Sequence, residues 1–551
     1  MRVALAQIDT TAGDVAGNLR RILDAWSRAR AAGADMVVLP ELALVGYPPR
    51  DLLLREGVVR ATLEATHELA RAAGSGPALV VGTLARNPAP VGPALVNAAA
   101  FLRGGRLEAL YAKRLLPTYD VFDERRYFAP GTQAVVVNHA GRRLGLLVCE
   151  DLWSADRVAG RRLYEADPPA DTQRLGADLL VSLSASPYHG GKDAHRSALF
   201  AGEARRVGLP LVAVHLVGGN DDVLFDGRSR LYDRTGREVA RLLAFREDLR
   251  VLDLDAALAG PGPAPEALPP AAELRQALVM GLRGYATKTG FTRALIGLSG
   301  GVDSAVTACL AAEALGPANV LGVSMPSRFT ADMSREDARE LARRLGIGFT
   351  EIPIEPPFRA LLEVLTPAFA GKAPDVTEEN LQARIRGAIL MALSNKHGHL
   401  LLATGNKSEV SVGYCTLYGD TNGGLAILSD VWKTSVYDVA RLYEAEGLLP
   451  SRSIARPPSA ELRENQKDTD SLPPYDVLDR ILALRVEQGL SLGEIVARGA
   501  DRATAERVLR LVERSEYKRR QMAPGLKVTP LAFGVGWRMP IARPVDLSGE
   551  I

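Results

Sequence analysis

In the first half of the chain, short apolar runs alternate with turn signals and with longer stretches of helical length. The runs predict strands at residues 3–8, 36–39, 79–84, 144–149, 179–183 and 211–216. Residues 19–32 and 60–73 are expected to be helical, and the glycine-containing turns at 103–106 and 234–237 indicate hairpins. This mixture is typical of two sheets covered by helices.

The second half alternates strand and helix more regularly. Strands are predicted at residues 294–298, 320–325, 349–354 and 400–404, and helices at 305–315, 333–345 and 381–396. This order predicts a parallel, doubly wound sheet of the Rossmann-like kind. After about residue 480 the pattern predicts helices and then irregular chain.

A stretch rich in proline separates these two patterned regions. Residues 256–272 contain five prolines and two glycines, a composition typical of a semi-rigid linker. We therefore expect one domain over residues 1–255 and a second over residues 273–551.

Composition excludes several classes of protein. Hydrophobic residues make up 47% of the chain and charged residues 24%, which is typical of a soluble globular protein. The 67 basic and 65 acidic side chains nearly cancel, so no nucleic-acid partner is expected. Cys149, Cys309 and Cys415 lie far apart, which argues against a disulfide framework or a structural zinc site and fits a reducing compartment. The first apolar run is too short for a signal peptide and no run has the length of a membrane span, so we expect a cytoplasmic protein.

Three chemically active side chains follow strands of the first half. Cys149 ends one apolar strand, Glu41 follows the strand at 36–39, and Lys113 closely follows another apolar run. A nearby base or cation lowers the pKa of a thiol and makes it nucleophilic. Taken singly, a cysteine is more often a small buried apolar residue, and a charged residue at a strand end is more often solvated. A base, a cation and a thiol in three separate strand-end loops instead favour a nucleophilic site.

The strings LPE at 39–41, YAK at 111–113 and CEDLW at 149–153 resemble the three signatures of the nitrilase-type amidohydrolases. The resemblance implies an α-β-β-α sandwich with a catalytic triad. In that triad Glu41 is the general base, Cys149 is the nucleophile that forms a glutamyl thioester, and Lys113 stabilises the oxyanion. The resemblance also implies contacts to glutamine by three residues in shorter motifs, Tyr119, Ser186 and Lys192.

A glycine-rich string, SGGVDS at 299–304, lies between a predicted strand and a predicted helix. Paired glycines let backbone N–H groups approach a phosphate closely, and a helix N-terminus favours an anion. Asp303 is suited to hold Mg²⁺ against pyrophosphate. The string lacks the lysine of the GxxxxGK[ST] loop and is therefore a different motif. A tight turn without a ligand is the alternative interpretation.

This string resembles the pyrophosphatase loop of the N-type ATP pyrophosphatases, which cleave ATP to AMP and pyrophosphate. Further strings resemble those of NAD synthetases: DVTEENLQARIR at 375–386, TGNKSE at 404–409, YGD at 418–420, DVWKT at 430–434 and YKRRQ at 517–521. The resemblance implies that Asn380, Glu409 and Lys518 contact deamido-NAD and that Asp303 and Glu409 share Mg²⁺. It implies an ATP site made by Gly297, Leu298, Ser299, Gly300, Gly301, Val302, Asp303, Ser304 and Thr404. Lys433 and Lys467 are candidate phosphate or pyrophosphate contacts, although solvent exposure is the favoured interpretation of Lys467, a single lysine in a polar, proline-flanked loop.

Together the resemblances imply that glutamine hydrolysis supplies ammonia for the ATP-dependent amidation of deamido-NAD, without a prosthetic group. The ammonia has to reach the second site unprotonated, so an internal tunnel is expected, and so is a homo-oligomer of at least two chains. Three alternatives stay open: another adenylating amidotransferase, an RNA-modifying protein such as a tRNA thiolase, and a non-catalytic scaffold of two decayed enzyme folds. The NAD synthetase strings, the near-neutral charge and the presence of every expected polar group disfavour these in turn.

Overall fold

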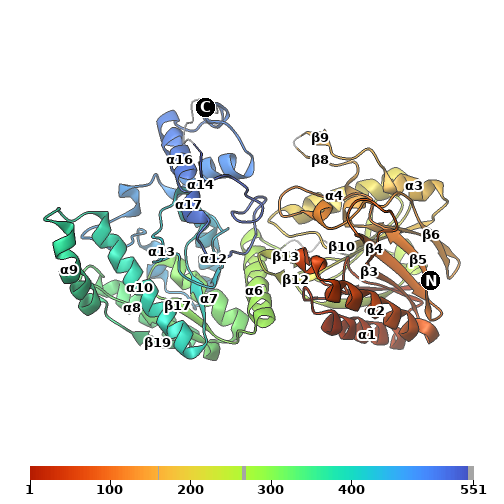
Figure 1. The fold of residues 1–551 in the computed structure, drawn as a ribbon, viewed down its shortest axis with the longest axis horizontal. Coiled ribbons are helices and arrows are strands. Elements are labelled where there is room, and N and C mark those ends of the chain that lie inside the picture. The colour runs from red at the N-terminus through yellow and green to blue at the C-terminus, as the bar shows by residue number, and fades with distance from the viewer. Residues whose placement is uncertain (159, 264–267, 544–551) are drawn as a thin grey trace. The chain divides into compact units, whose positions relative to one another are not determined.

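The structure is a computed structural model that describes residues 1–158, 160–263 and 268–543 (Figure 1). The chain divides into two compact units, Met1–Ala267 and Leu268–Ile551. Among the described residues, no helix combines the length and the apolar character needed to cross a membrane.

Two six-stranded sheets form the centre of the first unit. The first sheet has the order β16 (Asp248–Asp253), β1 (Arg2–Gln7), β2 (Met36–Val38), β3 (Ala78–Arg86), β4 (Leu95–Arg103) and β5 (Arg106–Ala112). The second has the order β15 (Glu238–Arg241), β14 (Arg230–Tyr232), β11 (Leu211–His215), β10 (Leu179–Ser184), β7 (Arg142–Val148) and β6 (Val136–His139). The middle strands of each sheet are parallel, and antiparallel strands extend the edges, including β16, which pairs with β1 from the other end of the unit. Short hairpins, β8 (Arg157–Val158) with β9 (Arg161–Arg162) and β12 (Val217–Asn220) with β13 (Val223–Asp226), complete the strands.

The two sheets pack face to face, and helices cover their outer faces. Successive side chains of a strand point to opposite faces, so in β1 Val3 and Leu5 join the core between the sheets. The alternate residues of β1 instead join the core beneath α1 (Val15–Ala31) and α2 (Glu56–Ala72). The helices α3 (Pro168–Arg174) and α4 (Lys192–Val207) pack on the second sheet. This arrangement confirms the predicted α-β-β-α sandwich.

A five-stranded parallel sheet forms the centre of the second unit. Its order is β19 (Gly348–Glu351), β18 (Val320–Ser324), β17 (Ala294–Gly297), β20 (Leu400–Ala403) and β21 (Leu425–Ala426). The chain leaves β17 through α7 (Val302–Leu315) and β18 through α8 (Asp332–Leu345), then returns to β20 through α9 (Glu355–Phe369) and α10 (Val376–His397). The order therefore reverses between β17 and β20, and folds of this kind bind ligands in the crevice that such a reversal creates. The predicted doubly wound sheet is confirmed.

Further helices surround this sheet. Helices α6 (Pro270–Thr289) and α12 (Lys433–Ala445) pack against α7. Shorter ones follow in α11 (Lys407–Val412), α13 (Ser451–Ala455), α14 (Tyr475–Leu482), α15 (Leu492–Ala497), α16 (Arg502–Arg514) and α17 (Glu516–Arg519).

The predicted linker at 256–272 is wrong at both ends, and residues 264–267 of it lie outside the described residues. Helix α5 (Leu254–Ala259) runs into it from one side, and α6 begins at Pro270 on the other. Proline is tolerated in the first turn of a helix, where its missing N–H has no intrahelical partner. The prolines at 269 and 270 therefore start a helix instead of preventing one.

Candidate active sites

Cys149 lies in a strained turn at the end of β7. Its side chain is only 3% exposed, and its backbone has a φ of 42°, a left-handed conformation that costs a non-glycine residue about 1–3 kcal/mol. The turn continues as a 3₁₀ helix, Cys149–Trp153. The carboxylate of Asp151 closes the turn by accepting the N–H of Val148 at 2.9 Å.

The same carboxylate joins the turn to the segment that carries Lys113. Asp151 also accepts the backbone N–H groups of Arg114 at 3.1 Å and Leu115 at 3.0 Å, and the hydroxyl of Tyr111 at 2.8 Å. These bonds flank Lys113 on both sides and fix its backbone beside the cysteine turn.

Glu41 and Lys113 form a buried ion pair in this site. The ammonium of Lys113 donates to Oε1 of Glu41 at 2.8 Å, and both side chains are 1% exposed. Oε1 of Glu41 also accepts the amide of Asn97 at 2.7 Å, and its Oε2 accepts the backbone N–H of Ala185 at 2.9 Å. These donors fix the direction of the Glu41 carboxylate.

The ammonium of Lys113 also contacts a second buried carboxylate, Glu124, which the sequence did not predict. Its Oε1 accepts from the ammonium of Lys113 at 2.8 Å and from the hydroxyl of Tyr47 at 2.9 Å. Burial raises the pKa of Glu124 to about 7, although Lys113 acts in the opposite direction. Glu124 follows no strand and belongs to no motif, so the sequence offers no local signal for it.

The expectation that the environment lowers the pKa of the Cys149 thiol is wrong. Burial raises this pKa well above its usual value, and the negative charge of Glu41 raises it further. The charge of Lys113 acts in the opposite direction but is outweighed. The resting side chain is therefore a thiol, which needs a base at the moment of attack.

The residues predicted to contact glutamine lie around this turn. The hydroxyl of Tyr119 donates to both carboxylate oxygens of Glu150, at 3.0 and 3.1 Å, and the hydroxyl of Tyr164 donates to Glu150 at 2.9 Å. Ser186, at 5% exposure, directly follows the residue whose N–H binds Glu41. The ammonium of Lys192 lies 5.7 Å from the ring centre of Trp153. Glu150, which lies in the CEDLW string but was given no role by the sequence, is thus buried and held by two tyrosine hydroxyls next to Cys149.

In the second unit, a cavity of about 470 Å³ lies at the strand-order reversal. It brings together most of the residues predicted for the synthetase site: Gly297, Leu298, Ser299, Gly301, Val302, Asp303, Ser304, Asn380, Thr404, Glu409, Lys433 and Lys518. Gly300 is not part of its lining. A side chain at Gly300, whose φ is +80°, would meet the backbone of Ser334 on α8 at 2.4 Å. Lys467 also lies outside the lining and is exposed, as the favoured interpretation expected.

The glycine-rich loop is preorganised at the start of α7. The hydroxyl of Ser299 accepts the N–H of Gly301 at 3.2 Å and lies 3.2 Å from the hydroxyl of Ser304. The hydroxyl of Ser304 donates to the carbonyl of Gly301 at 3.0 Å. The first turn of α7 thus faces the cavity with backbone N–H groups, which is favourable for a phosphate.

Lys433, a candidate phosphate contact, is buried in the lining of this cavity. Its side chain is 2% exposed, and its ammonium contacts the carboxylate of Asp303 and lies 3.3 Å from Oε1 of Glu409. Burial, which outweighs Lys433, raises the pKa of Glu409 to about 8. Asn406, also buried, donates its amide to Asp303 at 2.9 Å and accepts the N–H of Glu409 at 3.0 Å. Asp303 and Glu409 therefore face a single cation between them.

Three further polar side chains line the same cavity: Lys518, Asn380 and Arg386. The ammonium of Lys518 donates to the carbonyls of Gly413 and Cys415, each at 2.7 Å. Asn380 accepts the hydroxyl of Thr416 at 2.8 Å. Arg386, which the sequence analysis did not assign, donates to the carbonyl of Met325 at 3.0 Å. Burial lowers the pKa of Arg386 to about 10, which is the expected effect where a cation has little compensating negative charge.

Two family models match the chain: carbon-nitrogen hydrolase over residues 2–263 and NAD synthase over residues 274–522. The glutamine-dependent NAD(+) synthetase of Synechocystis sp. is 46% identical over 555 residues, covering 100% of each chain. That of Thermotoga maritima is 41% identical over 580 residues, covering 98% of each chain.

Two solved structures share the architecture. The glutamine-dependent NAD+ synthetase of Acinetobacter baumannii, determined with ADP, is 39% identical with a TM-score of 0.78, and the match covers 98% of each chain. The glutamine-dependent NAD(+) synthetase of Cytophaga hutchinsonii supports the fold, with a TM-score of 0.85 at 23% identity over 99% of this chain and 98% of that one. With a carbon-nitrogen hydrolase region and an NAD synthase region on one chain, and relatives above 40% identity along its whole length, this protein belongs to the family of glutamine-dependent NAD(+) synthetases.

Proposed function

We propose that the first unit hydrolyses glutamine and that the second uses the ammonia and ATP to convert deamido-NAD into NAD. The products are NAD, glutamate, AMP and pyrophosphate. One observation carries the proposal: a buried Glu41–Lys113 pair beside Cys149 occurs on the same chain as a cavity lined by an SGGVDS loop.

Glutamine hydrolysis begins with proton transfer. Because the thiol of Cys149 is protonated at rest, Glu41 takes its proton as the sulfur attacks the carboxamide carbon. Lys113 stabilises the negative oxygen of the tetrahedral intermediate, since a fixed cation in a dry site favours developing negative charge. Glu41 returns the proton to the leaving nitrogen, and ammonia departs from a thioester. Water, deprotonated by Glu41, then releases glutamate and restores the thiol.

The surroundings of Cys149 suit an α-amino acid amide better than a simple amide. Glu150 provides a buried carboxylate for the α-ammonium group of glutamine. Burial raises the pKa of Glu150, and the positive charge of the bound α-ammonium group lowers that pKa again. Lys192 and Ser186 provide a cation and a hydroxyl for the α-carboxylate. Tyr119 and Tyr164 orient Glu150 through their hydroxyl groups.

In the second unit, a carboxylate oxygen of deamido-NAD attacks the α-phosphorus of ATP and pyrophosphate leaves. The activation is required because ammonia does not displace an oxide ion from a carboxylate. Ammonia then attacks the acyl carbon, and AMP leaves with the bonding electron pair. The loop N–H groups, the first turn of α7 and Arg386 stabilise negative charge on the phosphates. Thr404 contacts ATP, and Asn380, Glu409 and Lys518 contact deamido-NAD.

The acidic residues of this cavity fit Mg²⁺, which proteins bind through one or two carboxylates together with substrate phosphates. Asp303 and Glu409 would hold the ion, because both already face one cation, Lys433. The ion would neutralise phosphate charge during loss of pyrophosphate. The described residues hold no cluster of three or more His, Cys, Asp or Glu suited to a metal, so phosphate oxygens and water would complete the coordination. No prosthetic group is required.

We also propose a homo-oligomer of at least two chains and a cytoplasmic location. The three cysteines are free, which suits a reducing compartment. Size-exclusion chromatography that finds only the 59.0 kDa chain would contradict the oligomer.

The first test compares wild type with Cys149→Ala, each supplied with ATP, Mg²⁺, deamido-NAD and either glutamine or ammonium chloride. The variant should lose glutamine-driven synthesis and keep ammonia-driven synthesis. Cys309→Ala is the matched control, because that thiol is buried in α7 and does not line the cavity. Loss of neither activity in Cys149→Ala would contradict the glutaminase site, and a wild type that makes no NAD would contradict the whole proposal.

A further inference from the structure

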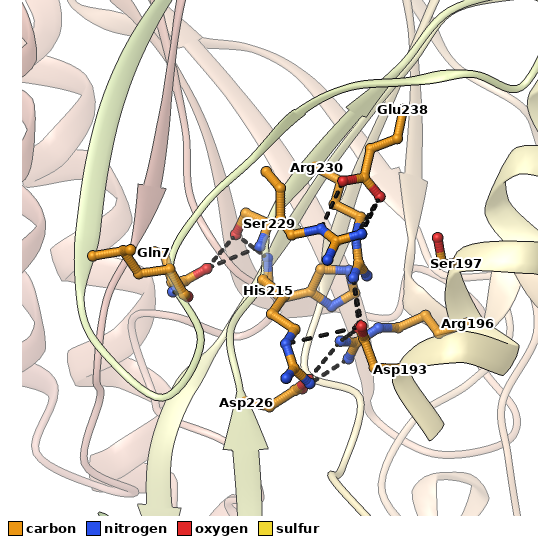
Figure 2. A network of polar contacts seen from close by, with 12 residues as sticks. Gln7, Asp193, Arg196, Ser197, His215, Asp226, Ser229, Arg230 and Glu238 are labelled. Carbon is orange, nitrogen blue, oxygen red and sulfur yellow. Dashed lines mark hydrogen bonds and ion pairs between the residues drawn. The ribbon is translucent and has the colours of Figure 1, made fainter. Parts of the chain in front are cut away.

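The segment between β10 and α4 carries Ser186, leads directly into Lys192, and is fastened at three points. At its start, the N–H of Ala185 binds Glu41. In its middle, the N–H of Tyr188 donates to the carbonyl of Leu224 on β13 at 2.7 Å. At its end, the second residue of α4 is Asp193, whose carboxylate lies in a network of charged side chains (Figure 2).

Asp193 is surrounded by three arginines. Its carboxylate accepts from Nη2 of Arg196 at 2.9 Å and from Nη2 of Arg230 at 2.6 and 2.7 Å. The Nε of Arg228 lies 3.9 Å from it. Figure 2 shows Arg196 and Arg230 approaching this carboxylate from the helix and from the sheet.

Two further carboxylates complete this network, which we call the arginine cluster (Asp193, Arg196, Asp226, Arg228, Arg230 and Glu238). Asp226, at the end of β13, accepts from Arg196 at 2.9 and 2.7 Å and from Arg228 at 3.2 Å. Glu238 of β15 lies 3.0 Å from Nε of Arg230. The cluster therefore joins the first turn of α4 to β13, β14 and β15.

The three arginines and Asp226 of the arginine cluster are buried, while Asp193 is 20% and Glu238 16% exposed, which makes the cluster a costly way to attach a helix. Arg230 is 0% exposed, Arg196 1% and Asp226 2%. Removing charges from water is unfavourable, and apolar residues of similar size attach helices at least as strongly. Ion pairs add direction, because a guanidinium donates to carboxylates only along its fixed N–H bonds. Apolar contacts alone would hold α4 against the sheet. The directional ion pairs of the cluster also fix the position of its first turn.

A row of aromatic rings connects the cluster to the turn of Cys149. His215, at the end of β11, stacks on Phe200 of α4 with ring centres 5.7 Å apart, and Phe200 lies edge-on to Trp153 at 6.2 Å. Trp153 ends the turn and lies beneath the ammonium of Lys192. Burial and the neighbouring guanidinium groups lower the pKa of His215 well below its usual value, so its ring adds no charge to the cluster.

We propose that the arginine cluster is a positioning device for glutamine recognition: it fixes Lys192, one residue before Asp193, at the place of the substrate α-carboxylate. The inference rests on the proposed glutaminase function. Among the contacts given for the described residues, none joins the cluster to Cys149 or Lys113, so its disruption weakens glutamine binding while attack on a carboxamide-bearing reagent persists.

The test measures glutamine hydrolysis by full-length wild type, Asp193→Asn, Arg230→Lys and a control, Arg205→Gln. Arg205 also lies on α4 but is exposed and binds only the carbonyl of Thr235 among the contacts described. Alkylation of Cys149 by iodoacetamide, which has an amide but neither α-group, is followed in parallel. Asp193→Asn should raise the KM for glutamine about tenfold or more, with kcat and the alkylation rate changing less than about threefold. Arg230→Lys, which keeps the charge, should also raise the KM with little change in kcat or alkylation rate, but by a smaller factor. Arg205→Gln should match wild type in all three quantities.

An unchanged KM in folded Asp193→Asn would overturn the inference. A parallel fall of kcat, alkylation rate and melting temperature would overturn it as well, because it would mean general damage to the unit. If Asp193→Asn does not fold, Arg230→Lys decides, and a wild-type KM there refutes positioning. A wild type that hydrolyses no glutamine but makes NAD from ammonia would instead refute the glutaminase function itself.

Discussion

Replacing Lys433 by methionine removes the cation between two carboxylates and tests how the synthetase cavity balances charge. At the 3.3 Å between Lys433 and Glu409, the Coulomb attraction is about 5 kcal/mol for an effective dielectric constant of about 20. Asp303 is in direct contact with the same ammonium. Desolvation offsets part of this attraction, and removing one partner of a buried pair costs about 3–5 kcal/mol. At pH 7 Glu409 is largely protonated, because its pKa is about 8, so the partner that loses its cation is mainly Asp303 and the cost lies at the lower end of this range. We therefore expect a loss of about 3 kcal/mol at pH 7.

This loss should grow as the pH rises from 7 to 9. A carboxyl whose folded pKa lies above its unfolded value binds more protons in the folded protein, so its contribution to stability falls as the pH rises through that interval. Without Lys433, ionised Asp303 and Glu409 also repel each other.

Thermal unfolding in EDTA measures the effect. A loss of about 3 kcal/mol corresponds to a melting temperature lower by on the order of 10 °C. Lys467→Met is the matched control and should be neutral, since Lys467 is exposed. Millimolar Mg²⁺ should stabilise Lys433→Met more than wild type, because the metal replaces the missing cation. Equal melting temperatures for the two variants would refute the ion-pair reasoning, and an equal response to Mg²⁺ would refute the assignment of Asp303 and Glu409.

Three further predictions concern the two sites. Glutaminase activity of wild type should fall as the pH drops below about 7, because only ionised Glu124 holds Lys113 and its pKa is about 7, and Glu124→Gln should lose this acidic limb; pH–rate profiles measure this, and an unshifted limb argues against the role. Glu150→Gln should raise the KM for glutamine roughly 10- to 100-fold through loss of a charge-assisted contact, while ammonia-driven synthesis stays at the wild-type rate; steady-state kinetics with both nitrogen donors would expose an error if the two rates fall together. Asn406→Ala should raise the Mg²⁺ concentration for half-maximal synthesis several-fold and lower stability by about 1 kcal/mol through loss of a helix cap; calorimetric Mg²⁺ titration that finds wild-type affinity would contradict the positioning of the carboxylates.

Local sequence patterns located the residues that immediately follow strands. Cys149 and Glu41 could be found because a strand end is marked by the end of an apolar run, and the neighbouring sheet then brings such ends together. Glu124 could not be found in this way. It begins a short 3₁₀ helix, Glu124–Arg126, and its role depends on a contact with Lys113 that only the folded path of the chain creates.

Burial was the quantity that sequence reasoning estimated worst. The string around Lys433 carries no local sign of its burial, because its partner Asp303 lies 130 residues earlier in the chain and reaches it only through the sheet. The thiol of Cys149 shows the same limit. The sequence reveals Lys113, whose charge lowers the pKa of the thiol, but it does not reveal the burial that raises this pKa by more. Proline at 270 was misinterpreted for a different reason, since the same residue type both ends and begins helices.

The buried, protonated thiol of Cys149 has a consequence for the durability of the protein. Peroxides react with thiolates and hardly with thiols, so a cysteine that keeps its proton until an amide arrives is a poor target for oxidation. An enzyme of this kind tolerates oxidative stress between turnovers better than one that stores a thiolate. In the proposed mechanism, the same desolvation that makes Cys149 depend on Glu41 for its deprotonation thus preserves it as a usable nucleophile when glutamine is scarce.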